Sequence, residues 1–447
     1  MYLQRKVDEV LDAWREEKER KPLLIRGARQ VGKTSAVRKL GTHFTHYLEI
    51  NFEENQAYKE LFDSNFSVNE ICEQLALLQN TPIISGKTLL FLDEIQACKQ
   101  AIGKLRFFYE SMPDLHVIAA GSLLEFALAE LPSFGVGRIR SLFMYPLSFP
   151  EFLIAINEKT LLDYIEQHHF QKPLPEAIHQ KIMLLHKKFL IIGGMPEVVK
   201  AYAQGKSLLD VQRIIDDLII SVQADFDKYK ALFPAIRLIE VFNTIAAQMG
   251  SKFTYSYPES TLNYPQIKEC LHLLQLAGLI YPVTHSAANG IPLGAETNPK
   301  KRKFLIYDTG IFQRLLGLEI GNLFIQDDFS LINKGNIAEL AVGLELLKNE
   351  DSYSKKSLYY WQREARNSQA ELDYVYQNET QLIPIEVKAG TKGRMLSLFL
   401  FLKEKNLPFG IRVSSENFAE MDQVKVMPIY AVHNLKQMLQ TLQNKNK

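Results

Sequence analysis

Residues 27–34 read Gly27-Ala28-Arg29-Gln30-Val31-Gly32-Lys33-Thr34, the GxxxxGKT pattern of a phosphate-binding loop. The apolar run Leu23-Leu24-Ile25 before it predicts a short buried strand, and residues 35–40 after it predict a helix. In this order, the glycines let successive backbone N–H groups turn inward around a phosphate at the positive end of the helix. We therefore expect Lys33 to reach the β- and γ-phosphates of a nucleotide and the Thr34 hydroxyl to bind Mg²⁺.

A second apolar run ends in two carboxylates. Residues 88–94 read Thr88-Leu89-Leu90-Phe91-Leu92-Asp93-Glu94. A strand buried on both faces of a parallel sheet has this composition, and its acids then lie at the carboxyl-terminal edge of the sheet. We expect Asp93 to bind Mg²⁺, directly or through water, and Glu94 to polarise the water that attacks the γ-phosphate. Acids also begin many surface loops, so this pattern alone would be weak evidence. It is strong evidence here because a phosphate-binding loop precedes it in the chain.

Two polar residues further along could complete this site. The apolar run 115–122 predicts another strand of the same parallel sheet, which binds its ligand at the carboxyl ends of the strands. Ser122 then lies beside Asp93, where it senses the γ-phosphate or positions water; the alternative is an ordinary strand-ending turn. Arg138 either neutralises charge during phosphoryl transfer, in the same chain or across an oligomer interface, or forms a surface pair with an acid.

The composition excludes several classes of protein. The chain has 447 residues, 47% hydrophobic and 23% charged, which predicts a globular protein of two or three domains. Its net charge of +1 gives no overall field that would attract nucleic acid or a membrane. No apolar run reaches the length of about 18 residues that crosses a bilayer, and the charged N-terminus does not fit a signal peptide. Three widely spaced cysteines suggest no disulfide framework, so we expect a cytoplasmic location without membrane partners.

A helix followed by a strand in the second half is typical of a winged helix. Residues 265–278 predict the helix, which would place its N-terminal side chains in the major groove of DNA, and residues 279–283 predict the wing. The alternative is an amphipathic helix packed against a hairpin as a scaffold or as a surface for a partner, because this helix has one lysine and no arginine. The basic run 300–303 nearby meets backbone phosphates or is simply solvated.

Four residues near the C-terminus form the pattern of PD-(D/E)xK nucleases. Glu339 lies on a predicted helix, Asp373 on a predicted strand, and Glu386 and Lys388 two residues apart on the next strand. Alternation places Glu386 and Lys388 on the same face of that strand. The pattern predicts a metal site made by Glu339, Asp373 and Glu386, with Lys388 stabilising a hydroxide or the transition state. The alternative is a fold of this kind retained for binding alone.

Five motifs together resemble the prokaryotic AAA-type ATPases that carry a C-terminal domain of unknown function. They are GARQVGKT (27–34), FLDEIQ (91–96), AAGS (119–122), the pair Gly137-Arg138, and PLSFPEF (146–152). The resemblance implies ATP as the nucleotide and an α/β fold with four segments. These are a P-loop ATPase core (1–150), a helical lid (151–230), a winged helix (231–320) and a restriction-endonuclease-like α/β domain (321–447). At residue 122 this chain has serine where many relatives have asparagine.

These observations favour an ATPase that uses Mg²⁺ and couples its nucleotide state to a C-terminal half facing DNA. One alternative is an ATP-regulated, Mg²⁺-dependent DNA endonuclease. Another is a switch or interaction protein that binds ATP with negligible turnover, although Glu94 argues against it. ATPases of this mechanistic class often form rings, so we expect a homo-oligomer if Arg138 completes the site of a neighbouring chain.

Overall fold

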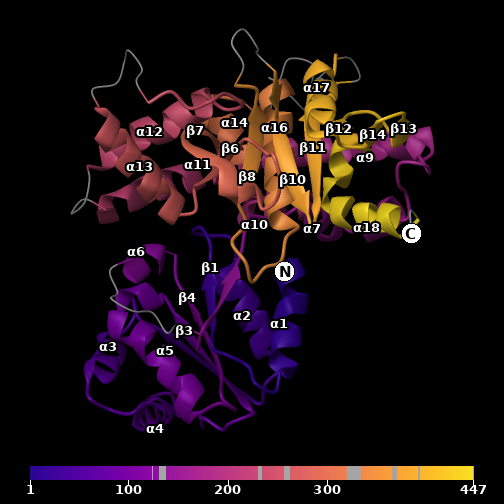
Figure 1. The fold of residues 1–447 in the computed structure, drawn as a ribbon. Helices are drawn as coiled ribbons and strands as arrows, with labels where there is room; N and C mark the ends of the chain where they lie inside the picture. Colours follow the sequence, from indigo (N-terminus) through magenta and orange to yellow (C-terminus); the bar gives the residue numbers. More distant parts are fainter. Residues whose placement is uncertain are drawn as a thin grey trace. The chain divides into compact units, whose positions relative to one another are not determined.

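A five-stranded sheet forms the core of the N-terminal part of the chain in this computed structural model (Figure 1). Its strands lie in the order β2-β3-β4-β1-β5, and every neighbouring pair is parallel. The strands are β1 (Leu23–Arg26), β2 (His46–Asn51), β3 (Thr88–Asp93), β4 (His116–Ala120) and β5 (Arg140–Phe143). This confirms the parallel α/β sheet that the sequence predicts.

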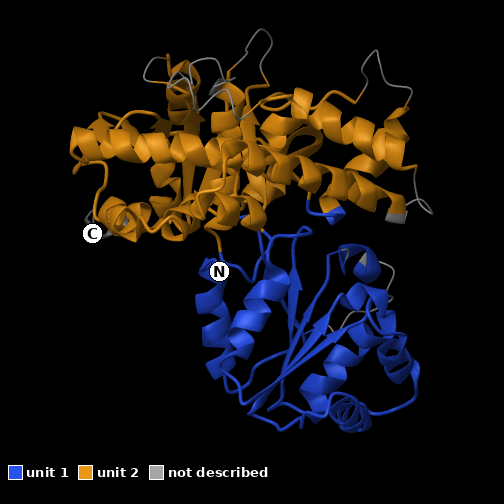
Figure 2. Cartoon of the chain, turned by 180° about the vertical axis from the view of Figure 1, so that it is seen from behind, with its two compact units in different colours: residues 1–146, 276–278, 351–355 blue, residues 147–275, 279–350, 356–447 orange. Residues whose placement is uncertain are grey.

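The structure describes residues 1–122, 124–129, 137–229, 234–255, 262–319, 334–364, 370–390 and 393–445. Its contacts divide the chain into two compact units (Figure 2). The first comprises Met1–Pro146 with Leu276–Gly278 and Asp351–Lys355, and the second comprises Leu147–Gln275, Leu279–Glu350 and Lys356–Lys447. No helix within the described ranges is both long enough and apolar enough to cross a bilayer.

Helices cover both faces of the parallel sheet (Figure 1). One face packs against α3, α4 and α5, whose apolar side chains join Leu48, Leu90 and Val117 in a single core, and the other packs against α2. Strand β3 is fully buried for this reason, which explains its continuous apolar composition. The helices of this unit are α1 (Lys6–Glu16), α2 (Lys33–Gly41), α3 (Gln56–Asp63), α4 (Val68–Leu78), α5 (Lys99–Ser111) and α6 (Leu124–Ala129).

The second unit begins with a run of helices. They are α7 (Phe149–Ala155), α8 (Lys159–Glu166), α9 (Glu176–Ile192), α10 (Pro196–Ala203), α11 (Leu208–Asp225), α12 (Ala235–Ala247) and α13 (Tyr264–Leu276). Among the described residues, further helices are interspersed with strands: α14 (Thr309–Leu315), α16 (Lys334–Lys348), α17 (Leu396–Lys405) and α18 (Leu435–Lys445).

Two sheets complete the second unit. The first has the order β7-β6-β8-β9, and the second has the order β10-β11-β12-β14-β13. Their strands are β6 (Ile280–Ser286), β7 (Thr297–Ile306), β8 (Leu358–Gln362), β9 (Glu371–Leu372), β10 (Tyr374–Asn378), β11 (Gln381–Val387), β12 (Gly410–Ser414), β13 (Ala419–Met421) and β14 (Val424–Pro428). Strand β8 pairs in parallel with β6, so the expected boundary at residue 320 lies between strands of one sheet. The finer domain boundaries stay a prediction.

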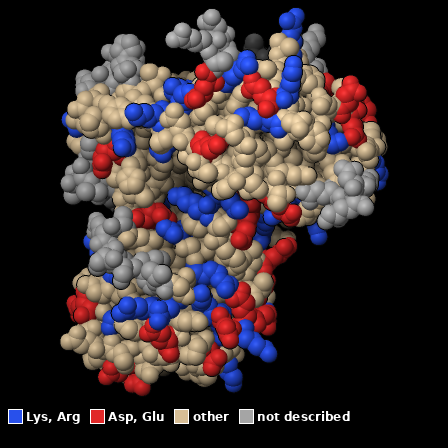
Figure 3. Space-filling view, in the orientation of Figure 1, with Lys and Arg blue, Asp and Glu red and all other residues tan. Residues whose placement is uncertain are grey.

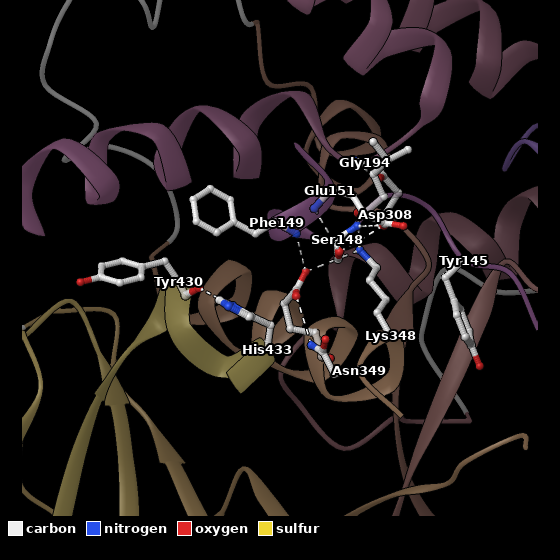
Figure 4. A network of polar contacts seen from close by, with 12 residues as sticks. Tyr145, Ser148, Phe149, Glu151, Gly194, Asp308, Lys348, Asn349, Tyr430 and His433 are labelled. Atoms are coloured by element: carbon white, nitrogen blue, oxygen red, sulfur yellow. Dashed lines mark hydrogen bonds and ion pairs between the residues drawn. The ribbon is translucent and has the colours of Figure 1, made fainter. Parts of the chain in front are cut away.

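A buried polar network explains the motif PLSFPEF (Figure 4). At the start of α7, the Phe149 N–H donates to Glu345 Oε1 at 3.1 Å, and Lys348 lies 4.0 Å from the same carboxylate. Asp308 accepts the Gly194 N–H at 2.6 Å. Burial raises the pKa of both Glu345 and Asp308, and backbone N–H donors oppose that rise. The Phe149 contact ties α7 to α16, and the Asp308 contact ties the start of α14 to the turn before α10, so the motif has a structural role in the second unit.

Candidate functional site

The phosphate-binding loop needs glycine at two of its positions. Gly32, which precedes α2, has φ 97°, and Gly27, at the start of the loop, has φ 148°. A Cβ at Gly27 would overlap the carbonyl oxygen of Met144. The loop therefore runs directly from β1 into the N-terminus of α2, with a backbone course that side chains at these two positions would oppose.

Lys33 lies at the first turn of α2 and is buried. Its Nζ donates to the carbonyl oxygens of Gly27 at 2.9 Å and Ala28 at 2.8 Å. Burial lowers the pKa of Lys33 to about 8, while the carboxylates of Glu94 and Asp93 oppose this shift. An anionic phosphate beside this ammonium would replace the hydration that burial removes.

Thr34 and Asp93 bring two oxygen atoms together at the end of β3. The Thr34 hydroxyl donates to Asp93 Oδ2 at 2.9 Å, and the Glu94 N–H donates to Asp93 Oδ1 at 3.0 Å. Burial raises the pKa of Asp93 to about 6, which a nearby cation would lower again. A hydroxyl and a carboxylate are oxygen ligands that suit Mg²⁺, so the residues present fit this ion.

Glu94 is held by a small polar cluster. Its backbone has φ 48°, in the left-handed region that non-glycine residues rarely adopt. Its Oε2 accepts the Gln96 side-chain amide at 2.6 Å and the Ser122 hydroxyl at 3.4 Å. The structure thus brings Ser122 to Glu94, as expected from the common edge of the sheet. Gln96 belongs to the site as well, although the only signal for it in the sequence is its place in the turn after Glu94.

Arg138 lies in a turn before β5 and forms an ion pair with Glu110 of α5. Its side chain is about half exposed, at 49%. This is the surface pair named above as the alternative for this residue, and a role in phosphoryl transfer stays a prediction. The preceding Gly135 and Val136 lie outside the described residues.

A second group of charged side chains gathers in the C-terminal unit, where β10 and β11 pair in antiparallel register. Asp373 Oδ2 accepts the Val387 N–H at 2.7 Å, and Lys388 Nζ lies 2.5 Å from Glu386 Oε1. The other carboxylate oxygen of Glu386 is buried and has no hydrogen-bond partner. Strand pairing therefore brings together Asp373, Glu386 and Lys388.

Glu339 joins this group through a lysine that the motif does not contain. Lys303 Nζ lies 2.9 Å from Glu339 Oε1 and 2.6 Å from Glu371 Oε1. Lys303 is only 1% exposed, so the expectation that the basic run 300–303 meets phosphates or solvent is wrong for this residue. Lys303 begins a run of four buried residues at the end of β7 (303–306), so no alternation of buried and exposed residues marks its position in the sequence.

We call Glu339, Glu371, Asp373 and Glu386, with Lys303 and Lys388, the carboxylate centre. Burial raises the pKa of Glu339 to about 7 although Lys303 opposes the rise, and burial likewise raises the pKa of Glu386 to about 7. Burial also raises the pKa of Asp373. Burial disfavours the Lys303 ammonium, but the Glu339 and Glu371 carboxylates outweigh it and raise the pKa of Lys303.

Different partners hold the three carboxylates of the predicted metal site, and that site stays a prediction. Within the described ranges, no three His, Cys, Asp or Glu side chains gather as a group that could hold a metal. Glu339 instead faces the ammonium of Lys303, while Asp373 and Glu386 lie at the end of β11.

Three family models match successive parts of the chain. Residues 19–153 match an AAA domain, residues 183–320 match a domain of unknown function (DUF8612), and residues 334–432 match another domain of unknown function (DUF4143). No curated protein matches the chain.

Several solved structures are distantly similar to the chain. The Walker-type ATPase paby2304 of Pyrococcus abyssi is 15% identical with a TM-score of 0.46, over 70% of this chain and 96% of that one. The Orc1 protein of Aeropyrum pernix in complex with DNA is 12% identical with a TM-score of 0.25, over 72% and 93%. Drosophila ORC bound to DNA is 16% identical with a TM-score of 0.26, over 70% and 85%. The assignment rests on the family models: residues 19–153 form an AAA-type P-loop ATPase domain, and two domains of unknown function follow it.

Proposed function

We propose that this protein hydrolyses ATP with Mg²⁺ at the carboxyl-terminal edge of the parallel sheet. The observation that carries the proposal is the 2.9 Å contact between the Thr34 hydroxyl and Asp93, directly beside the buried Lys33. These three side chains supply a cation for the phosphates and two oxygen ligands for Mg²⁺, which neutralises phosphate charge when it is bound. The backbone N–H groups of residues 27–34 would surround the phosphates.

Glu94 supplies the group that orients and polarises the attacking water. Its carboxylate lies next to Asp93 in the chain, and Gln96 and Ser122 hold it through hydrogen bonds. Since its backbone adopts φ 48°, the turn directs this side chain differently from a continuing strand. Ser122 and Gln96 are therefore positioning residues for Glu94.

The test compares ATP binding and steady-state phosphate release in four proteins. Lys33→Ala is expected to lose ATP binding, and Glu94→Gln is expected to bind ATP but release phosphate slowly. Lys39→Ala, an exposed lysine on the same helix, is the matched control and should behave as wild type. Unchanged hydrolysis in Lys33→Ala would place ATP turnover elsewhere and overturn the proposal.

We further propose that the nucleotide state is coupled to a DNA-facing C-terminal unit with a winged helix and a nuclease-like fold. Helix α13 followed by the β6–β7 hairpin supports the winged helix. On the face seen in Figure 3, Lys and Arg side chains are interspersed with Asp and Glu, so a DNA surface here would be local. Binding of duplex DNA with and without ATP, measured by fluorescence anisotropy, tests the coupling; equal affinity in both states contradicts it.

A second candidate function is ATP-regulated DNA cleavage. The convergence of Asp373, Glu386 and Lys388 at the end of β11 favours it, because nucleases of this class place these residue types together. The assay is cleavage of plasmid and single-stranded DNA with Mg²⁺ or Mn²⁺, with and without ATP. Cleavage that is lost in Asp373→Asn supports this candidate, and loss in Lys33→Ala adds that ATP regulates it. If no DNA is cleaved while ATP hydrolysis is intact, the C-terminal centre serves DNA binding alone.

A further inference from the structure

Lys303 is an unusual residue for its position. A lysine side chain is almost never fully buried unless an opposite charge pairs with it, and Lys303 is 1% exposed. Its Nζ lies within 2.9 Å of Glu339 Oε1 and within 2.6 Å of Glu371 Oε1. The ring of Tyr360 lies 5.2 Å from the same ammonium and adds a cation–π contact. These contacts form a buried site that holds one positive charge.

A divalent cation bound at this position would need the same carboxylate oxygens of Glu339 and Glu371 that now contact Lys303. Metal ions such as Mg²⁺ and Ca²⁺ bind carboxylate oxygens at about 2.0–2.6 Å. An ammonium already 2.9 Å from Glu339 Oε1 takes that oxygen and would repel a second cation at such short range. Lys388 does not act in the same way, because it contacts Glu386 and is partly exposed, at 27%.

We propose that Lys303 is a built-in counter-cation that keeps divalent metal ions off Glu339, so that the wild-type carboxylate centre loads no metal through this residue. This proposal rests on the nuclease-like centre of the proposed function. Of the two functions proposed for that centre, it favours DNA binding over DNA cleavage. Lys303 comes from β7, in the segment matched by one domain of unknown function, whereas Glu339 belongs to the other. The two domains thus share one charged centre.

The test is a Mn²⁺ titration followed by the electron paramagnetic resonance signal of free Mn²⁺. All full-length proteins carry Asp93→Asn, so that the nucleotide site adds no Mn²⁺ binding. The starting protein is compared with Lys303→Met, with Glu339→Gln, with the double variant Lys303→Met/Glu339→Gln, and with Lys301→Met. The last is the matched control, since Lys301 lies on the same strand but pairs with Glu364, which is largely exposed, at 60%.

The starting protein and Lys301→Met are expected to show no saturable Mn²⁺ binding up to about 1 mM, whereas Lys303→Met gains one site per chain with affinity at least about tenfold tighter. Glu339→Gln in the double variant should remove that site. Saturable binding in the starting protein that Glu339→Gln abolishes would overturn the proposal, as would a folded Lys303→Met that binds no Mn²⁺.

Removal of Lys303 leaves buried carboxylates unpaired, so thermal unfolding is measured alongside. The melting temperature of Lys303→Met should fall without metal and rise again with Mn²⁺, a rescue that Lys301→Met does not need. Lys303→Met/Glu371→Gln carries one unpaired carboxylate fewer and gives the same test if the single variant is unfolded. If Mn²⁺ restores neither protein, the proposal is wrong. ATP hydrolysis, measured with Asp93 intact, reports on the proposed function independently.

Discussion

The buried lysine of the phosphate-binding loop makes ATP affinity depend on pH. Lys33 has a pKa of about 8, below the ordinary value of 10.5. Below pH 8 the free protein already carries the ammonium that pairs with phosphate, so binding takes up no proton. Above pH 8 the free protein loses that proton and must take it up again to bind, so affinity falls as pH rises. Between pH 7 and pH 9 the dissociation constant should rise about tenfold, or about 1.4 kcal/mol.

Titration of a fluorescent ATP analogue with Mg²⁺ at pH 7, 8 and 9 measures this change directly. Lys33→Arg is the matched control, because arginine keeps its charge over this range and its dissociation constant should not vary with pH. A wild-type dissociation constant that is the same at pH 7 and pH 9 would refute the reasoning. So would an equal pH dependence in Lys33→Arg, since another group would then be titrating.

Three substitutions test other parts of the structure. Glu94→Gln should lower kcat about 10²–10³-fold because the attacking water loses its polarising group, while the dissociation constant for ATP stays nearly unchanged. Phosphate release measures kcat, and equilibrium titration measures the dissociation constant. Gly27→Ala should lower the free energy of unfolding by about 3 kcal/mol or more in urea, because its Cβ overlaps Met144; Gly86→Ala, with φ 78° and open space around it, should cost only about 1 kcal/mol. Asp308→Ala should cost about 2–4 kcal/mol by orphaning two buried N–H donors, and Asp308→Asn should recover part of that loss; equal losses would contradict the hydrogen-bond explanation.

The nucleotide half of the molecule was predictable from its sequence because local patterns determine it. The glycines at 27 and 32 require special backbone angles, and the apolar run before Asp93 requires a strand covered on both faces. Consecutive parallel strands then place Asp93, Glu94 and Ser122 at one edge of the sheet. Gln96 was not predictable in the same way, because a side chain in a turn finds its partner only through the tertiary fold.

Only part of the carboxylate centre could be predicted from patterns in the sequence. Alternation on one strand predicted that Glu386 and Lys388 lie on the same face, and in the structure their side chains are in contact. The contact of Lys303 with Glu339 depends on how β7 and α16 pack, across a separation that no local pattern encodes. A lysine beside other basic residues gives the same composition whether it faces water or a buried acid.

The parallel pairing of β8 with β6 has a practical consequence for working with fragments of this protein. A chain ended at residue 320 would keep the β6–β7 hairpin but lose β8, leaving unpaired backbone N–H and C=O groups along Val283 to His285. Such an open strand is a ready template for pairing with another copy, so this fragment should aggregate. A fragment that starts after residue 320 would lack β6, the partner of β8, and Lys303, the partner of Glu339. The C-terminal unit therefore has to be produced as one piece.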